Sequence, residues 1–182
     1  MVDLFNYTRR TSSVAHVGEL DLGGDNPIRI QSMTTTNTND TEACVRQAEE
    51  IIKAGGELVR FTTQGSREAE NMKNINAGIR ADGFTTPLVA DIHFNPNVAD
   101  VAALYCEKVR INPGNYVDPA RKFIKQEYTD EEYAHELQKI EERFVPFLNI
   151  CKENHTAIRI GVNHGSLSDR IRNRYGDTPE GI

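Results

Sequence analysis

The sequence predicts an α/β fold, an incomplete TIM-type (β/α) barrel, from the rhythm of its segments and the two-sided pattern of its strands. Strand-like runs alternate with helical patterns at intervals of roughly 20–30 residues, which is typical of parallel β/α units. Each strand has an aliphatic face and a polar face; Val109 and Ile111, for example, oppose Arg110 and Asn112. A doubly wound sheet, covered by helices on both faces, would give nearly continuous apolar strands. The polar faces therefore favour a barrel with a lumen.

The length of the chain indicates that this barrel is only partly present. The chain has 182 residues, whereas an eight-stranded barrel typically needs about 250. We therefore expect residues 1–182 to be the N-terminal part of a barrel domain, a fragment of a longer chain. Thr178 and Pro179 near the end resemble the cap and first turn of a helix, with no helix after them.

The barrel elements follow in order along the chain. A β-hairpin is expected over Val14–Leu22, around a turn at Gly18, outside the main sheet. Five parallel strands are expected at Ile28–Met33, Glu57–Thr63, Leu88–His93, Lys108–Asn112 and Ile158–Asn163. Helices should separate them, with capping residues at Asp40 or Thr41, at Ser66, at Asn95 and at Thr129. Pro146 falls inside the last helix, so we expect a kink or a break there.

Composition excludes several classes of protein. The net charge of −6 argues against nucleic acid or an anionic membrane as a partner of the whole surface. We expect no signal peptide, because the first residues lack a basic region followed by an apolar run, and no segment approaches the ~18 apolar residues of a membrane helix. The three cysteines, Cys44, Cys106 and Cys151, are far apart and odd in number. They are typical of buried thiols in a reducing cytoplasm, with no metal site expected within this chain.

Polar strand residues predict an anion-binding mouth at the C-terminal end of the lumen. The strands would end there with Thr62, His93, Asn112 and Asn163. Arg60, Asp91, Arg110 and Gly161 would lie one layer below, and Arg159 deeper, reaching upward past the side-chain-free Gly161. Guanidinium forks suit the paired oxygens of phosphate or diphosphate. The alternative is an internal network in which Asp91 pairs with Arg60 or Arg110, but one carboxylate cannot neutralise three arginines.

Asp91 and His93 lie on the same strand face as this arginine cluster. They suit acid/base partners or two metal ligands, and without a third ligand nearby in sequence we do not expect a metal. Asp91 would orient substrate hydroxyls or donate a proton, or else it would form a structural salt bridge. The loops Asn112–Asn115 and Asn163–Ser166 place glycine beside amide side chains, a pattern that can expose backbone N–H groups to an anion. His164 is a candidate donor in the second loop.

Five ordered motifs resemble the 4-hydroxy-3-methylbut-2-enyl diphosphate synthase family, the iron–sulfur enzymes of the methylerythritol phosphate route to isoprenoids. The motifs are PIRIQSMT (27–34), LVR (58–60), PLVADIHF (87–94), RINPGN (110–115) and RIGVNHGSL (159–167). They span nearly the whole chain. The longer segment between Asn115 and His155 resembles the long form of the family, which has an extra domain between the barrel and the cluster domain.

The resemblance implies a barrel that binds 2-C-methyl-D-erythritol 2,4-cyclodiphosphate, which is opened and reductively dehydrated. Two electrons would come from reduced flavodoxin or ferredoxin through a [4Fe-4S] cluster. The family's cluster ligands, three cysteines and a glutamate, belong to a C-terminal domain and match none of the cysteines here. In the family, the cluster domain of one subunit caps the barrel of the other, which implies a homodimer. The fragment would therefore bind substrate without turning it over.

The strand and loop patterns, together with the resemblance, give the candidate site residues of this chain. Asp91 and His93 are the candidate catalytic residues. The candidate substrate-binding residues are Arg60, Arg110, Asn112, Arg159, Asn163, His164 and Ser166. Two other functions fit the polar strand ends. A pterin-binding barrel of the dihydropteroate synthase kind would need no cluster. A non-catalytic diphosphate-binding module would keep any turnover intact in Arg110→Ala while losing affinity for its ligand.

Overall fold

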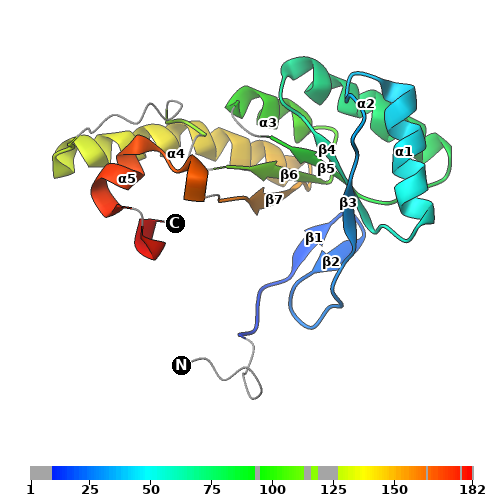
Figure 1. Cartoon of the computed structure of the whole chain (residues 1–182), viewed down its shortest axis with the longest axis horizontal. Coiled ribbons are helices and arrows are strands. Elements are labelled where there is room, and N and C mark those ends of the chain that lie inside the picture. Colours follow the sequence, from blue (N-terminus) through cyan, green and yellow to red (C-terminus); the bar gives the residue numbers. More distant parts are fainter. Residues whose placement is uncertain are drawn as a thin grey trace.

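The computed structural model describes residues 10–92, 95–112, 116–118, 127–162, 164–176 and 178–181. Within this part of the chain, five parallel strands form one sheet in the order β3-β4-β5-β6-β7 (Figure 1). Their bounds are β3 Gln31–Met33, β4 Leu58–Thr62, β5 Leu88–Asp91, β6 Lys108–Ile111 and β7 Ala157–Ile160. Each strand pairs with the next one along the chain, so the order never reverses as it does in a doubly wound sheet. The predicted partial barrel is confirmed.

Helices separate the five strands, as predicted, and a short helix follows the last strand. They are α1 Thr41–Lys53, α2 Ser66–Ala81, α3 Pro96–Ala102, α4 Asp130–Glu153 and the short α5 Asp169–Tyr175, with 3-10 turns η2 His164–Ser166 and η3 Pro179–Gly181. The predicted caps of α1 and α4 are confirmed: Asp40 accepts from the Ala43 N–H, and Thr129 accepts from the Glu132 N–H. The cap of α2 is Gly65, one residue before the predicted Ser66. Here the Glu68 carboxylate accepts the Gly65 N–H.

Pro146, where we expected a kink or a break, does not break the helix, because α4 continues through this residue. Pro146 is exposed, so its missing N–H lies on the solvent side, while the next residue, Phe147, is fully buried and holds the helix on the core. Thr178 and Pro179, which resemble a helix start, begin the 3-10 turn η3, and the Thr178 hydroxyl donates to the Tyr175 carbonyl.

The main core lies between the sheet and the helices on its outer face. It is formed by alternate strand residues, including Val59, Phe61, Ala90, Val109 and Ile111, packed on helix residues such as Met72, Ile75, Ile79 and Phe147. Each of these larger aliphatic and aromatic side chains contributes about 1.5–3 kcal/mol when fully buried. The remaining strand residues face the other side of the sheet, which is the lumen. The two-faced strand pattern is therefore confirmed for the central strands.

The edge strand β3 departs from the pattern. Ile28 and Ile30 were predicted to face the helices, yet they are 86% and 61% exposed, and the strand begins only at Gln31. On β7, at the other edge, Ile160 is 52% exposed. Exposed aliphatic residues thus gather at the two edges of the sheet, as expected where no further strand pairs with the edge.

The predicted hairpin is confirmed and closes the lower end of the lumen. Its strands, β1 Ala15–Val17 and β2 Leu20–Leu22, pair antiparallel around a turn at Gly18, where φ is +58°. A small separate cluster packs the hairpin onto the lumen face of the sheet, and its members are Val17, Leu20, Leu22, Leu58, Val89 and Ala157. Because the hairpin packs on the N-terminal end of the lumen face, the C-terminal end is the part of this face left for a ligand. No helix in the part of the chain that the structure describes is long and apolar enough to cross a membrane.

Candidate anion-binding site at the C-terminal mouth

Asp91 is the centre of the polar cluster at the C-terminal end of the lumen. It ends β5 and is fully buried. One carboxylate oxygen accepts a hydrogen bond from Arg60 on β4, and the other accepts from Nη1 of Arg110 on β6 at 3.2 Å. The internal ion pairs that sequence reasoning offered as the alternative are therefore present. They hold two guanidiniums side by side at the mouth.

Register places the third arginine at the same level as the second. Arg110 is the direct neighbour of Arg159 across the β6–β7 ladder. The prediction that Arg159 lies deeper was wrong, because β7 ends at Ile160 and not at Asn163, so its residues lie nearer the mouth than expected. Arg159 is exposed, so an anion arriving from solvent can reach its side chain.

Gly161 makes room for Arg110. A Cβ atom on Gly161 would overlap Nε of Arg110 and would lie 2.8 Å from its Cζ and Nη2 atoms. In the observed arrangement, Nη2 of Arg110 donates to the Gly161 carbonyl at 3.0 Å. The backbone of Gly161, which carries no side chain, therefore leaves the space in which the Arg110 guanidinium lies. Arg159 does not use this space, although the sequence had suggested that it would.

The lumen face of the sheet carries an excess of positive charge. Lys108 lies two residues before Arg110 and so shares its face of β6. Sequence reasoning missed this residue, although the same alternation points to it. Burial, and then the nearby Arg159, lower the pKa of Lys108. Among the described strand residues that face the lumen, four cations thus accompany the single carboxylate of Asp91.

Arg60 has an unused donor at this site. Its Nε atom is buried and has no hydrogen-bond partner among the described residues. A buried donor without a partner is costly. Because three arginines accompany one carboxylate here, the arrangement around Asp91 is suited to bind an anion with several oxygens.

Replacing Lys108 by methionine is expected to raise the unfolding free energy of the complete protein by about 0.5–1 kcal/mol. The gain is small because solvent screens the repulsion felt by a half-buried ammonium group. A lowered pKa means that the unfolded chain binds this proton more firmly, so Lys108 costs stability at neutral pH. That cost disappears as the pH rises through the folded pKa toward about 10.4. Thermal melts between neutral and alkaline pH should show the advantage of Lys108→Met shrinking. An advantage that grows with pH would contradict this interpretation.

The loops after β6 and β7 bring two more predicted residues together. Asn112 is buried, and its side-chain nitrogen donates to the Ser166 hydroxyl at 2.6 Å. His93 and Asn163 lie outside the described residues, as does the side chain of His164. The structure therefore gathers six predicted residues at the mouth, which are Arg60, Asp91, Arg110, Asn112, Arg159 and Ser166. The roles of all nine candidates stay predictions.

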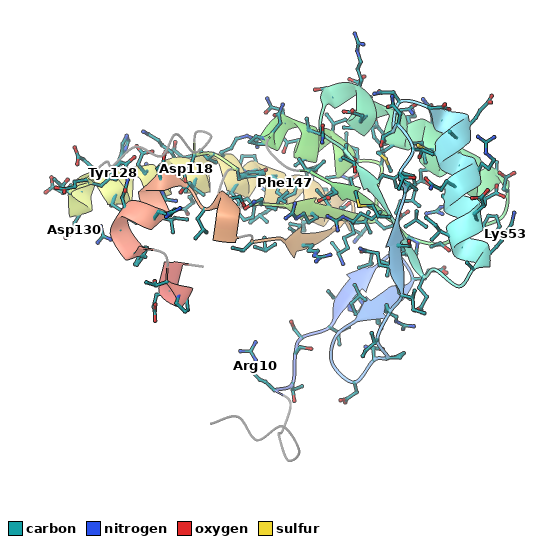
Figure 2. All side chains as sticks on the ribbon, in the orientation of Figure 1. Arg10, Lys53, Asp118, Tyr128, Asp130 and Phe147 are labelled. Carbon is teal, nitrogen blue, oxygen red and sulfur yellow. The ribbon has the colours of Figure 1, made fainter. Side chains whose placement is uncertain are left out.

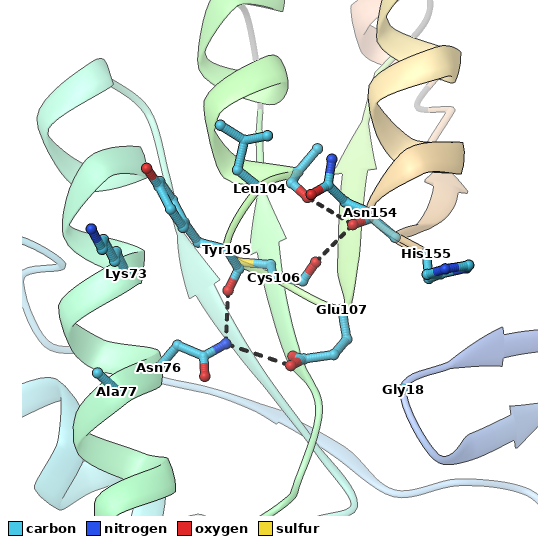
Figure 3. A pocket seen from close by; sticks show the side chains of 12 residues that line it. Gly18, Lys73, Asn76, Ala77, Leu104, Tyr105, Cys106, Glu107, Asn154 and His155 are labelled. Carbon is cyan, nitrogen blue, oxygen red and sulfur yellow. Dashed lines mark hydrogen bonds between the residues drawn. The ribbon is translucent and has the colours of Figure 1, made fainter.

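A cavity of about 460 Å³ opens at the opposite end of the sheet (Figure 3). Glu107 and Asn76 lie in its wall, and the hairpin turn at Gly18 borders it. The Glu107 carboxylate accepts from Arg80 and from the Leu88 N–H, both at 2.8 Å. These polar groups already hold parts of the fold together. The cavity therefore offers a ligand fewer available hydrogen-bonding groups than the mouth does.

The cysteines do not suit an iron–sulfur cluster. Cys44, Cys106 and Cys151 are all buried. Burial raises the pKa of each thiol, that of Cys151 to about 12, whereas metal binding needs the thiolate. Among the residues with a described placement, no group of three or more His, Cys, Asp or Glu side chains could hold a metal ion.

Comparisons with known proteins agree with the motifs. Over 181 residues the chain is 75% identical to "4-hydroxy-3-methylbut-2-en-1-yl diphosphate synthase (flavodoxin)" of Phocaeicola vulgatus and 74% identical to the protein of the same name from Bacteroides thetaiotaomicron. Both matches cover 100% of this chain and 30% of the relative. The protein of that name from Akkermansia muciniphila is 53% identical over 178 residues, covering 98% of this chain and 30% of the relative. The chain thus spans about 30% of the length of these curated relatives.

One solved structure, 7,8-dihydropteroate synthase from Vibrio fischeri ES114, matches with a TM-score of 0.40 and 16% identity, covering 80% of this chain and 63% of that one. This likeness is too weak to support the pterin-binding alternative. The family model described as the GcpE TIM-barrel domain matches residues 11–182. Since that match takes in nearly the whole chain, the chain belongs to the GcpE TIM-barrel domain family.

Proposed function

We propose that this chain is the substrate-binding part of an enzyme that converts 2-C-methyl-D-erythritol 2,4-cyclodiphosphate to 4-hydroxy-3-methylbut-2-enyl diphosphate. The observation that carries the proposal is the excess of cations around Asp91 at the mouth. A cyclic diphosphate is an anion whose oxygens match guanidinium forks. The names of the curated relatives support the same reaction.

The residues of the mouth would contact different parts of the substrate. Asp91 holds Arg60 and Arg110 in place, and each guanidinium has five N–H donors, more than these contacts use. The remaining donors would bind the diphosphate, with Arg159 as the third cation. Asn112 would hold the sugar-derived part of the substrate from the neighbouring loop. Asp91, with His93, would orient substrate hydroxyls or donate a proton.

The electrons must come from elsewhere in the complete protein, because the cysteines of this chain do not fit a cluster. We propose that residues 1–182 are the N-terminal part of the barrel domain. The rest of the protein would supply the closing strands, an inserted domain and a [4Fe-4S] domain. Reduced flavodoxin or ferredoxin would deliver the electrons to a homodimer in the cytoplasm. The isolated fragment should bind substrate without turnover.

Replacing Arg110 by alanine in the complete protein tests the proposal. Loss of a charge-assisted contact of about 1.5–3 kcal/mol should weaken binding of the cyclodiphosphate roughly 10- to 100-fold. Isothermal titration calorimetry measures this directly. Arg143→Ala is the matched control, because Arg143 pairs with Asp100 between α3 and α4, on the helical side of the sheet, and should leave the affinity unchanged.

Three results would contradict the proposal. The complete protein could fail to bind the cyclodiphosphate, or it could prefer a pterin. Alternatively, Arg110→Ala could lose affinity and keep full turnover, which would favour the non-catalytic diphosphate-binding module.

A further inference from the structure

A buried ion pair joins the segments that follow β6 and β7. Asp118 lies after β6, and Arg170 lies in the first turn of α5, after β7. The Arg170 guanidinium makes a two-pronged contact, with Nε 3.1 Å and Nη2 2.9 Å from the two carboxylate oxygens of Asp118. Both side chains are only 5% exposed. This ion pair therefore fixes the segment after β6 to the segment after β7.

Aromatic packing reinforces this junction, which we call the clasp (Asp118 and Arg170). The Arg170 guanidinium lies 5.0 Å from the ring centre of Tyr133, and that of Arg174 lies 4.3 Å from the same ring. Both distances are typical of cation–π contacts. Arg174 also pairs with Asp130. Figure 2 shows Asp118 and Asp130 at the end of the molecule where α5 lies beside the first half of α4.

The clasp lies close in sequence to residues of the proposed binding site. Asp118 follows Asn112 by six residues, and Arg170 follows Ser166 by four. Asn112 and Ser166 are themselves hydrogen-bonded at 2.6 Å. The two loops are thus joined twice, once at the mouth and once behind it. Two joints restrict relative movement of the loops far more than either would alone.

A buried ion pair is a weak source of net stability, because desolvation offsets the attraction, but its geometry is specific. The two-pronged contact accordingly fixes orientation more than it adds folding energy. We propose that Asp118 and Arg170 are positioning residues, which hold Asn112 and Ser166 in the geometry that binds the substrate. This inference rests on the proposed function, and it assigns neither residue a contact with substrate.

The test uses Asp118→Asn in the complete protein, which removes the charge and keeps the shape. Displacing the loops should weaken binding of the cyclodiphosphate about tenfold, because misplacement by an ångström is enough for such losses. Asp100→Asn is the matched control, since it breaks the Arg143 pair on the helical side. It should leave the affinity unchanged. Hydrogen exchange of residues 157–162 and 164–168 should rise in Asp118→Asn only.

A second variant covers the case in which Asp118→Asn does not fold. Arg170→Lys keeps the charge and loses the two-pronged geometry, so it should weaken binding less than Asp118→Asn but measurably. Wild-type affinity in a folded variant of either residue would overturn the inference. If the wild-type protein itself fails to bind the cyclodiphosphate, the proposed function falls instead. The hydrogen-exchange comparison then still decides whether the clasp holds the loops, and unchanged exchange would overturn it.

Discussion

Asp91→Asn is expected to lower the unfolding free energy of the complete protein by about 3 kcal/mol, the lower end of the range for breaking a buried ion pair. Asp91 is fully buried, and it neutralises Arg60 and Arg110 together. Without its charge, two guanidiniums would face each other with no counter-charge between them. The lower end applies because their side chains keep 23% and 14% exposure, so water screens part of the repulsion.

Chemical denaturation of the wild type and the variant measures this difference. Asp100→Asn is again the matched control, because its pair with Arg143 is about one quarter exposed and should cost less than about 1 kcal/mol. Inorganic pyrophosphate should narrow the gap between Asp91→Asn and the wild type, since a bound anion takes over the neutralising role. Equal costs for the two substitutions, with no effect of pyrophosphate, would show that Asp91 is not the charge centre of the mouth.

The central strands were predictable because their pattern is local. A strand covered by helices on one side alternates with a period of two, and Val109 and Ile111 follow that rule. The same rule failed at Ile28 and Ile30. The alternation of a single strand cannot tell whether another element covers its aliphatic face, and at the edge of this sheet none of the described elements does.

The grouping of side chains at the mouth was predictable, but the depth of each one was not. Arg60, Asp91 and Arg110 were placed on one face from parity alone, and they are in contact. The level of Arg159 depends on the register between β6 and β7, which hydrogen bonds between strands set and spacing along one strand does not. Arg170 and Asp118 are 52 residues apart in the sequence, so no local sequence pattern could predict their contact.

Gly161→Ala is expected to lower kcat/KM of the complete protein about 100-fold, because small displacements of a binding group have effects of this size. The added Cβ would take the space of the Arg110 guanidinium. Arg110 would then lose its contacts with Asp91 and with the Gly161 carbonyl. The guanidinium is the far end of a flexible side chain, so it can move away without unfolding the sheet. Steady-state kinetics with a chemical reductant measures the loss.

A double-mutant cycle shows whether this loss passes through Arg110. If Gly161→Ala acts only by displacing that guanidinium, adding it to Arg110→Ala should cause little further loss, because the group it displaces is already gone. Losses that simply add would mean that the new methyl group blocks the substrate itself. The slot beside Gly161 would then belong to the ligand, and the role of Gly161 in seating Arg110 would be refuted.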